Sequence, residues 1–374
     1  MIYYDYTLNQ KEPNEILSAM RDDGYNIRFI YNQTSEIQIT AVTKTPSAIK
    51  YIVDPVEEAQ LISVSNDGLL IKYIEDPTDN VKMKAVQQNG NALRLIKSPS
   101  EALQKEAVSR NGFLIRYIKS PSKIVKTCAI ENNPSCIRYI NDLDEDLQLK
   151  CVKQDSYLIK FITNPSARTV IEAVSNNGNV IEFISNPAHD VQLAAVKNNP
   201  SSIRLIKNPS NEAQEYAVGA NSYCINYISN PSLQAQLNAV VKDGSNIRFI
   251  KNPSLEVCKA ALSNNPYIIQ FLRDPSEELQ LYAINMNPYS IKFIENPTDI
   301  VKRAAVKSNG WVIQLIEDPT LTLIQEAILS QTETVFYLIG KYELSKEDIP
   351  PSGLQYLKNR KYDKFTWEEE TPEA

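Results

Sequence analysis

The chain has 374 residues, of which 43% are hydrophobic and 22% charged, so it is long enough for several folded domains or for one extended array. A formal net charge of −6 argues against a generally basic protein, but a local basic face remains compatible with it. The N-terminal residues MIYYDYTLNQ lack a basic region before an apolar run, and no run of about 18 apolar residues occurs. We expect a cytoplasmic protein with no membrane span.

Five cysteines occupy positions whose spacing suits neither a disulfide framework nor a CxxC metal site. They are Cys128, Cys136, Cys151, Cys224 and Cys258. We interpret them as small core residues and expect no metal and no cofactor.

A 22-residue repeat covers nearly the whole chain. Proline, taken as position 1, occupies twelve of the fourteen sites spaced 22 residues apart between 33 and 319, with Gln33 and Leu143 as exceptions. An earlier repeat beginning at Lys11 fits the same frame. Fifteen repeats therefore span 11–340, after a lead-in at 1–10. Residues 341–374 are interpreted as a C-terminal capping segment and acidic tail, because the end repeats of an array face water on one side.

The first helix of each repeat is predicted over positions 1 to 12. Position 22, directly before the proline, is Asn, Asp or Ser in fourteen repeats, which predicts a helix N-cap there. Glutamate at position 3 then falls where it can complete a capping box. The glutamates in question are Glu57, Glu101, Glu145 and Glu277. Apolar positions 5, 9 and 10, as in Val191, Ala195 and Val196, predict the buried face.

A turn and a second short helix follow. Position 13 is Asn or Asp in thirteen repeats and is followed by Gly seven times and by Pro five times. Asn-Gly predicts a helix end through a left-handed residue. The second helix, α or 3₁₀, is predicted over positions 15 to 21, with core residues at 17, 19 and 20, as in Ile203, Leu205 and Ile206.

Glutamine at position 6 lies inside the apolar face of the first helix in eight repeats. We expect these side chains to be buried, with their amides bonded to backbone groups of the turns in their own or the adjacent repeat. They are Gln38, Gln60, Gln104, Gln148, Gln192, Gln214, Gln236 and Gln280.

Neither short helix is stable alone in water, so the repeats must stack. We expect an all-α fold, a right-handed α-solenoid of about fifteen two-helix repeats. The segments AVQQNGNALRLI (85–96) and AVSNNGNVIEFI (173–184) resemble the tandem AVxxNGxxLxY repeats of a domain of unknown function, and the spacing is similar to leucine-rich-repeat variants and HEAT-like repeats. The resemblance implies an α-solenoid and brings no catalytic residues.

Position 18 lies opposite the apolar residues of the second helix and is predicted to face solvent. It is basic in each of the first seven repeats, and we call this set the basic ladder. Its members are Arg28, Lys50, Lys72, Arg94, Arg116, Arg138 and Lys160. Position 15, on the same face, adds aromatic side chains at Tyr25, Phe113 and Tyr157.

Two interpretations of the ladder stay open. In the structural one, each cation complements the C-terminal end of its short helix and pairs with the acidic first turn of the next repeat, as Arg94 with Glu101. In the functional one, cations beside aromatic rings contact a ligand, either phosphates and bases or an acidic protein segment.

The sequence gives little support for a catalytic function. The chain has one histidine, His189, and lacks the nucleotide-binding and nucleophile patterns GxGxxG, GK[ST] and GxSxG. The segment DLDED (142–146) spaces its aspartates like a calcium loop, but Leu147 and Lys153 stand where such a loop needs Gly and Glu. We expect a non-enzymatic scaffold that binds another protein through an acidic or extended segment. The alternative is a nucleic-acid-binding solenoid that uses the ladder as a phosphate track.

Overall fold

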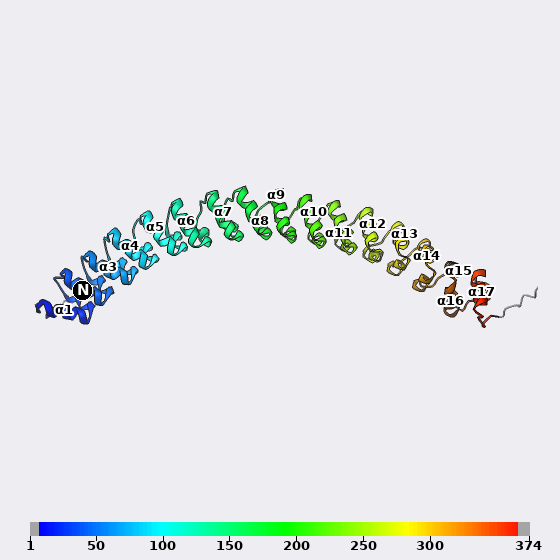
Figure 1. The fold of residues 1–374 in the computed structure, drawn as a ribbon, viewed down its shortest axis with the longest axis horizontal. Coiled ribbons are helices and arrows are strands. Elements are labelled where there is room, and N and C mark those ends of the chain that lie inside the picture. Colours follow the sequence, from blue (N-terminus) through cyan, green and yellow to red (C-terminus); the bar gives the residue numbers. More distant parts are fainter. Residues whose placement is uncertain (1–6, 366–374) are drawn as a thin grey trace, which may run out of the picture. The chain divides into compact units, whose positions relative to one another are not determined.

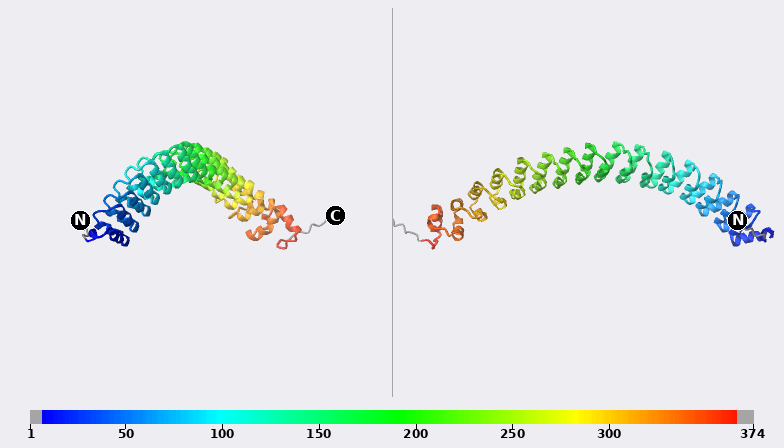
Figure 2. Two further views of the ribbon diagram at one scale, coloured as in Figure 1. Left: turned by 60° about the vertical axis from the view of Figure 1, so that its left-hand side comes forward. Right: turned by 180° about the vertical axis from the view of Figure 1, so that it is seen from behind.

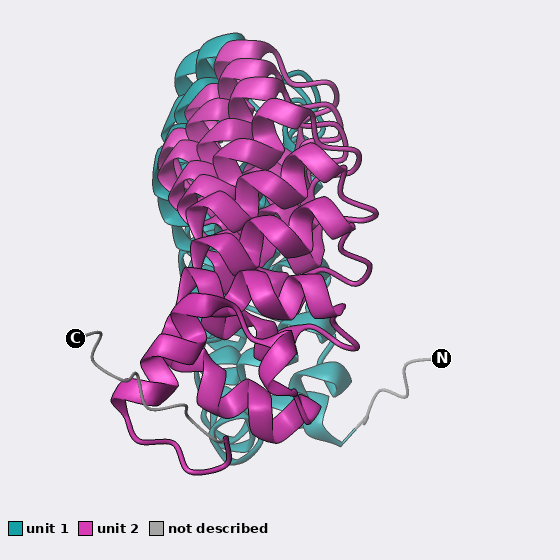
Figure 3. Ribbon diagram, turned by 90° about the vertical axis from the view of Figure 1, so that its right-hand side faces the viewer, with its two compact units in different colours: residues 1–176 teal, residues 177–374 magenta. Residues whose placement is uncertain are grey.

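The computed structural model describes residues 7–365, and this part of the chain contains α- and 3₁₀-helices and no strand. The chain divides into two compact units, residues 1–176 (unit 1) and 177–374 (unit 2) (Figure 3). Within each unit, successive α-helices and successive 3₁₀-helices lie side by side (Figures 1 and 2). The predicted all-α solenoid with a 22-residue period is confirmed.

Each repeat contributes a ten-residue α-helix over positions 3 to 12 and a 3₁₀-helix of six residues over positions 14 to 19, the last repeat excepted. In unit 1 the α-helices are α1 (Pro13–Asp22), α2 (Ser35–Lys44), α3 (Glu57–Asn66), α4 (Asp79–Gln88), α5 (Glu101–Arg110), α6 (Lys123–Asn132), α7 (Glu145–Gln154) and α8 (Ala167–Asn176). In unit 2 they are α9 (His189–Asn198), α10 (Asn211–Ala220), α11 (Leu233–Lys242), α12 (Leu255–Asn264), α13 (Glu277–Met286), α14 (Asp299–Ser308) and α15 (Leu321–Ser330).

The 3₁₀-helices alternate with these α-helices. In unit 1 they are η2 (Gly24–Phe29), η3 (Pro46–Tyr51), η4 (Gly68–Tyr73), η5 (Gly90–Leu95), η6 (Gly112–Tyr117), η7 (Pro134–Tyr139) and η8 (Ser156–Phe161). In unit 2 they are η9 (Gly178–Phe183), η10 (Pro200–Leu205), η11 (Ser222–Tyr227), η12 (Gly244–Phe249), η13 (Pro266–Phe271), η14 (Pro288–Phe293), η15 (Gly310–Leu315) and the short η16 (Thr332–Thr334).

The α-helices begin two residues later than predicted, because the N-cap is position 2. In eleven of the fifteen repeats a Ser, Thr or Asp side chain there accepts a hydrogen bond from the N–H of position 5, as Ser210 does from Ala213 at 3.3 Å. The predicted cap at position 22 is therefore wrong. That residue precedes the helix, and in five repeats it has a left-handed φ of 45° to 50°, which Asn and Asp tolerate better than most residues. These five are Ser98, Asn186, Asn252, Asp274 and Asp318.

The predicted capping boxes are wrong for the same reason. Each position-3 glutamate is the first residue of its helix, as Glu57 is in α3 and Glu277 in α13. Glu57 instead accepts a hydrogen bond from the hydroxyl of Thr78 at 2.8 Å, and Glu277 accepts one from Thr298 at 2.7 Å. Both donors lie in the next repeat, so these glutamates link repeats and do not close their own helix ends. Glu101 and Glu145 likewise occupy the first positions of α5 and α7.

Position 13 ends the α-helix and begins the 3₁₀-helix at the same residue. The backbone N–H of Asn199 donates to the carbonyl of Ala195 at 2.9 Å, while its side chain accepts from the N–H of Ser201 at 3.1 Å. The turn is confirmed, but the left-handed residue is not, since no glycine in residues 7–365 has a positive φ. Close packing explains glycine at position 14: a Cβ on Gly244 would lie 2.7 Å from the carbonyl oxygen of Ala261 in the next repeat.

The core follows the predicted positions with two corrections: it also includes position 16, as in Leu114 and Cys136, and it leaves out position 19. Val191, Ala195, Val196, Ile203 and Ile206 are buried as expected. Position 19 is not core: Leu205 is half-buried, and the tyrosines at 73, 117 and 139 are each 42% exposed. The second helix is 3₁₀ with three residues per turn, so positions 17 and 20 share one buried line and position 19 lies a third of a turn away.

The predicted hydrogen bonds of the position-6 glutamines are confirmed, and six of the eight side chains are buried, whereas Gln104 and Gln236 are half-buried. All eight donate a hydrogen bond to the carbonyl of position 1 in their own repeat, at 2.6 to 3.0 Å. In four of them the amide oxygen also accepts the N–H of position 2 in the next repeat, as Gln192 accepts from Ser210 at 2.8 Å. We call this pair of bonds the glutamine bridge. In these four repeats it ties the turn to the following one.

A second link between repeats was not predicted. At position 12, Gln88, Asn132, Asn198 and Asn264 accept the N–H of the position-14 glycine of the preceding repeat, at 2.6 to 2.9 Å. Where proline occupies position 14 there is no N–H to satisfy. After Pro46, Asn66 instead donates to Ile62 of its own helix. The sequence signal for this link is a glycine at position 14 followed, twenty residues later, by Asn or Gln.

The ends of the array depart from the 22-residue frame. At the start, Asn9 in η1 (Leu8–Gln10) donates to the carbonyl of Phe29 and accepts from the N–H of Tyr31. At the other end, α16 (Val335–Tyr342) and η17 (Lys346–Asp348) lead to α17 (Pro351–Asn359), which contacts α15. A Cβ on Gly353 would lie 2.8 Å from Ile328. Residues 1–6 of the lead-in and 366–374 of the predicted acidic tail lie outside the described residues.

Two glycine substitutions test the close packing, because they should change the free energy of unfolding in opposite directions. Gly244→Ala forces a methyl group against the carbonyl of Ala261 and should lower the free energy of unfolding by about 1 to 3 kcal/mol. Gly219→Ala, where a Cβ meets no atom within 4 Å, should raise it by about 0.5 to 1 kcal/mol because alanine favours the helix. Urea denaturation followed by circular dichroism measures both, and equal effects would contradict the packing argument.

The glutamine bridge predicts a graded effect of removing the amide. Gln192→Leu leaves both the Pro187 carbonyl and the Ser210 N–H without their partner and should cost about 1 to 3 kcal/mol. Gln280→Leu should cost less, since the amide oxygen of Gln280 accepts no hydrogen bond. Denaturation midpoints of the two variants give the comparison. A larger loss for Gln280→Leu would refute the bridge as the source of stability.

Candidate binding surface

The basic ladder lies entirely in unit 1, on the layer of 3₁₀-helices. Each of its seven side chains is exposed and belongs to the last turn of a 3₁₀-helix, from Arg28 in η2 to Lys160 in η8. The predicted solvent-facing orientation of position 18 is confirmed. A cation there also complements the partial negative charge at the helix C-terminus.

The cations lie over aromatic rings at position 19. Arg94 and Arg116 both approach the ring of Tyr117, each with its guanidinium carbon 4.7 Å from the ring centroid. Arg138 and Lys160 share the ring of Phe161 in the same way, at 4.8 and 5.1 Å. Nearer the N-terminus, Arg28 lies over Phe29 at 4.5 Å, Lys50 over Tyr51 at 4.9 Å and Lys72 over Tyr73 at 4.8 Å. Cation–π attraction therefore holds the ladder against the surface.

Position-15 aromatics pack against the ring at position 19 of the next repeat. Tyr25 meets Tyr51 edge-on, with centroids 5.9 Å apart, and Phe113 meets Tyr139 at 6.2 Å. Tyr157, at the same position of η8, is 41% exposed. The structure thus brings the predicted position-15 and position-18 residues to one face. Sequence reasoning missed the position-19 rings between them, because a rotation of 100° per residue assigns position 19 to the core.

No ion pair joins the first six ladder cations to a carboxylate within residues 7–365. The predicted pairing of Arg94 with Glu101 is therefore wrong. Arg94 turns toward Tyr117 of the following repeat, while Glu101 begins α5. Neighbouring cations on one ring repel each other, and the described part of the chain provides no counter-charge for these six.

Unit 2 has fewer cations at position 18 than unit 1. Arg248 lies over Phe249 at 4.7 Å and Lys292 over Phe293 at 6.0 Å. A third cation, Arg204, occupies position 18 two repeats before Arg248, and the repeats between and after these cations have uncharged residues there. The uncharged residues are Asn226, Gln270 and Gln314, and the first repeat of the unit has Glu182. The cations of unit 2 therefore stand two repeats apart, and the continuous ladder is a property of unit 1.

The acidic segment DLDED starts a helix. Asp144 is the N-cap of α7 and accepts the N–H of Leu147 at 3.0 Å. Lys123 forms an ion pair with Asp144 at 2.7 Å, and this hydrogen bond holds the pKa of the Asp144 carboxyl below its usual range. Among residues 7–365, no group of three or more His, Cys, Asp or Glu side chains is placed to hold a metal ion.

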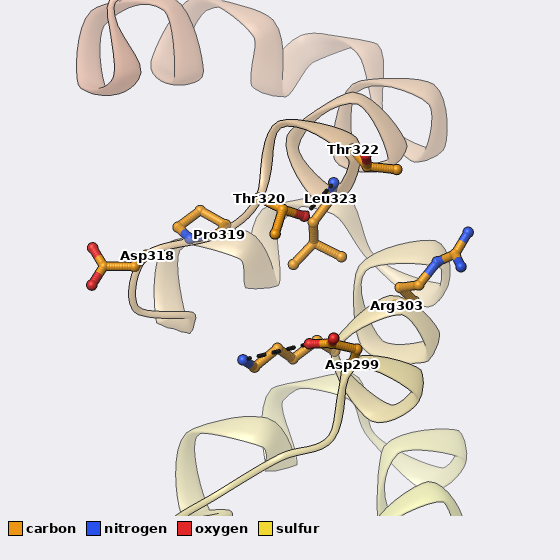
Figure 4. A pocket seen from close by; sticks show the side chains of 8 residues that line it. Asp299, Arg303, Asp318, Pro319, Thr320, Thr322 and Leu323 are labelled. Atoms are coloured by element: carbon orange, nitrogen blue, oxygen red, sulfur yellow. Dashed lines mark hydrogen bonds and ion pairs between the residues drawn. The ribbon is translucent and has the colours of Figure 1, made fainter.

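A small pocket of about 210 Å³ lies between α14 and α15 (Figure 4). Several of its polar groups are already paired: Lys302 with Asp299 at 3.9 Å, and the Thr320 hydroxyl with the N–H of Leu323 at 3.3 Å. Arg303, on its rim, forms an ion pair with Glu326. The pocket is therefore explained by helix capping and ion pairing between repeats.

Comparisons of the chain with protein-family models, with curated proteins and with solved structures find no match. Within the described residues, every helix is too short or too polar to cross a bilayer.

Most of the cysteine side chains lie in the core, and burial raises the pKa of their thiols. All five are free thiols, and four are buried. Burial, with a smaller contribution from the neighbouring Cys151, raises the pKa of Cys136 to about 12. Burial also raises the pKa of Cys151 to about 11.

The raised thiol pKa values predict slow alkylation of the folded protein. Only the thiolate attacks iodoacetamide, and a pKa near 11 or 12 keeps Cys136 and Cys151 protonated at pH 8. Mass spectrometry should find both unmodified in the folded protein and fully modified in guanidinium chloride, while half-buried Cys128 reacts faster. Rapid labelling of Cys136 at pH 8 without denaturant would contradict the buried placement.

Proposed function

We propose that the chain is a non-enzymatic helical-repeat scaffold whose basic ladder binds an acidic, extended segment of another protein. The observation that carries the proposal is the run of exposed cations, six of which have no carboxylate partner in the described residues. A structural charge balance would place counter-ions within the array, as it does for Lys150 with Glu131 at 2.6 Å. The ladder cations instead present their charge to solvent.

The cation–π geometry favours a protein over a nucleic acid. Binding of single strands uses free aromatic faces on which bases stack. Here cations already lie over the rings, as Arg94 and Arg116 do over Tyr117. A carboxylate or a phosphate can bind a guanidinium without displacing it from the ring, whereas a stacked base would have to displace it, so the geometry counts against base stacking. The net charge of −6 also repels a long polyanion away from the ladder.

Nucleic acid is the second candidate, supported by the unbroken series of seven cations in unit 1. In that case the ladder is a phosphate track, and affinity falls steeply as salt concentration rises. We also propose, for either function, that the repeats are related to AVxxNG, leucine-rich-repeat-variant and HEAT-like repeats. A cytoplasmic location is part of the proposal, and the five free thiols support it.

Charge reversal in the ladder tests the proposal. The variant R94E/R116E/R138E should lose a partner protein that the wild type captures from cell lysate, and this partner should survive nuclease treatment. The matched control is R204E/R248E/K292E, which changes the same repeat position in unit 2 by the same charge. It should retain the partner.

Two results would count against the proposal. If nuclease abolishes capture by the wild type, the ladder serves nucleic acid. If R94E/R116E/R138E unfolds at a much lower temperature than the control variant, the ladder serves stability. We expect little change in melting temperature, because each ladder contact is exposed and exposed cation–π pairs contribute about 0.5 to 1 kcal/mol.

A further inference from the structure

One groove in unit 2 has a positively charged lining. It has a volume of about 500 Å³ and lies between the turn that follows η12 and the turn that follows η13. Three cations line it, Arg248, Lys251 and Arg273, together with one carboxylate, Asp274. Asp274 and Arg273 form a long ion pair of 3.9 Å, whereas no ion pair joins Arg248 or Lys251 to a carboxylate within residues 7–365. We call this site the cationic groove, and the formal charge of its lining is +2.

Equivalent grooves at other turns of unit 2 lack this excess of positive charge. The next groove along the chain, between the turns after η13 and η14, is lined by Asp274 and Glu295 and, among the described residues, by no cation. The groove between the turns after η9 and η10 has one cation, Lys207, and one carboxylate, Glu182. The groove between the turns after η14 and η15 has two of each. Of these four grooves, the cationic groove is the one in which cations outnumber carboxylates.

The side chain at position 6 also differs in the cationic groove, where Cys258 replaces the glutamine of other repeats. In a complete glutamine bridge, the Gln192 amide oxygen accepts the N–H of Ser210 at 2.8 Å. The shorter Cys258 side chain contacts only the carbonyl of Pro253, with its Sγ 4.0 Å from the oxygen. The N–H of Ser276, which is the equivalent of Ser210, has no hydrogen-bond partner in the described part of the chain. Ser276 lines the groove, so the space that the amide leaves opens on an unsatisfied donor.

This unsatisfied N–H belongs to the N-terminus of a ten-residue helix. Ser276 is the N-cap of α13, where the helix dipole and the free N–H groups favour an anion. The two glutamates of the first turn have partners in other repeats: Glu277 accepts from Thr298 at 2.7 Å, and Glu278 forms an ion pair with Lys259 at 2.6 Å. Neither glutamate lines the cationic groove. The cations and the helix end therefore favour negative charge in the same space.

We propose that the cationic groove binds a phosphate monoester, with the phosphate between the three cations and the Ser276 N–H. A monoester carries a charge of about −2 above pH 7, since its second pKa is about 6, and this charge matches that of the lining. Guanidinium groups bind phosphate oxygens through paired N–H donors. Sites for small molecules have volumes of roughly 300 to 1,000 Å³, so the groove has room for an organic group beside Phe271, which is 41% exposed. The site is independent of the basic ladder, and either proposal can fail without the other.

NMR titration of the full chain with phenyl phosphate at pH 7.5 tests the site. The amide signal of Ser276 should shift and saturate, because its N–H gains an acceptor. Phenyl sulfate, a monoanion of similar shape, is the matched ligand. It should bind at least roughly tenfold more weakly, because it lacks the second negative charge.

Substitutions at position 6 separate binding from folding. Cys258→Gln places in the groove the amide that other repeats have and gives the Ser276 N–H an acceptor. It should weaken phenyl phosphate binding at least roughly tenfold while raising the urea midpoint, since a buried donor gains its partner. Cys258→Ala removes the thiol and leaves the space open, so it should retain the affinity of the wild type.

A charge reversal with a matched control tests the cations. Lys251→Glu should reduce the affinity for phenyl phosphate at least roughly tenfold. Lys207→Glu changes the same repeat position in the groove between the turns after η9 and η10 and should leave the affinity unchanged.

Three results would overturn the inference. Equal affinities for phenyl phosphate and phenyl sulfate would show that the groove does not recognise the second charge. Unchanged binding by Cys258→Gln would place the phosphate outside the groove. If Lys207→Glu weakens binding as much as Lys251→Glu does, general surface charge and not this site attracts the ligand. None of these results bears on the acidic-segment function, which R94E/R116E/R138E tests.

Discussion

The hydrogen bonds that join consecutive turns are the constraint on which the rest of the structure depends. A ten-residue α-helix and a six-residue 3₁₀-helix are each too short to be stable in water, and every repeat adds turn backbone groups that need partners. The glutamine bridge supplies partners across the repeat boundary, as Gln192 does for Pro187 and Ser210. Stability is therefore a property of neighbouring repeats together.

The same contacts set the spacing of the surface groups. Glycine at position 14 lets the next α-helix approach until its backbone carbonyl would touch a methyl group, as at Gly244 and Ala261. Such contacts hold consecutive repeats close together, so the residues at one repeat position follow one another along the layer of 3₁₀-helices within a unit. Two cations of consecutive repeats, Arg94 and Arg116, can then share the single ring of Tyr117. The core thus brings the ladder cations to one face but does not space them evenly, because Lys72 lies over Tyr73 of its own repeat whereas Arg94 turns to the following one.

Much of this arrangement could be predicted from the sequence, since the period, the α-helical core positions and the buried glutamines depend on local pattern. The predictions failed where two local patterns competed. Asn and Asp before proline are good N-caps, yet Ser210 and its equivalents take that role, and residues such as Asn186 adopt a left-handed turn. Likewise, Gly244 resembles a left-handed helix end but has a negative φ and serves close packing.

The candidate surface could be predicted only in part. The exposure of position 18 is predictable because both α- and 3₁₀-helical rotations turn it by at least 100° from the buried position 17. An α-helical rotation of 100° per residue predicts position 19 in the core. The second helix is 3₁₀, and Tyr117 at this position is exposed. The expected pair of Arg94 with Glu101 depended on side-chain directions across a repeat boundary, which sequence spacing alone does not fix.

The most direct measurement of the central claim is the NMR signal of the arginine side-chain N–H groups during titration with poly-L-glutamate. We expect the signals of Arg94, Arg116 and Arg138 to shift together and to saturate at one dissociation constant, while those of Arg204 and Arg248 shift little. If poly-L-glutamate binds with equal shifts at Arg204 and Arg248, or with none at Arg94 and Arg116, the basic ladder is not the binding surface.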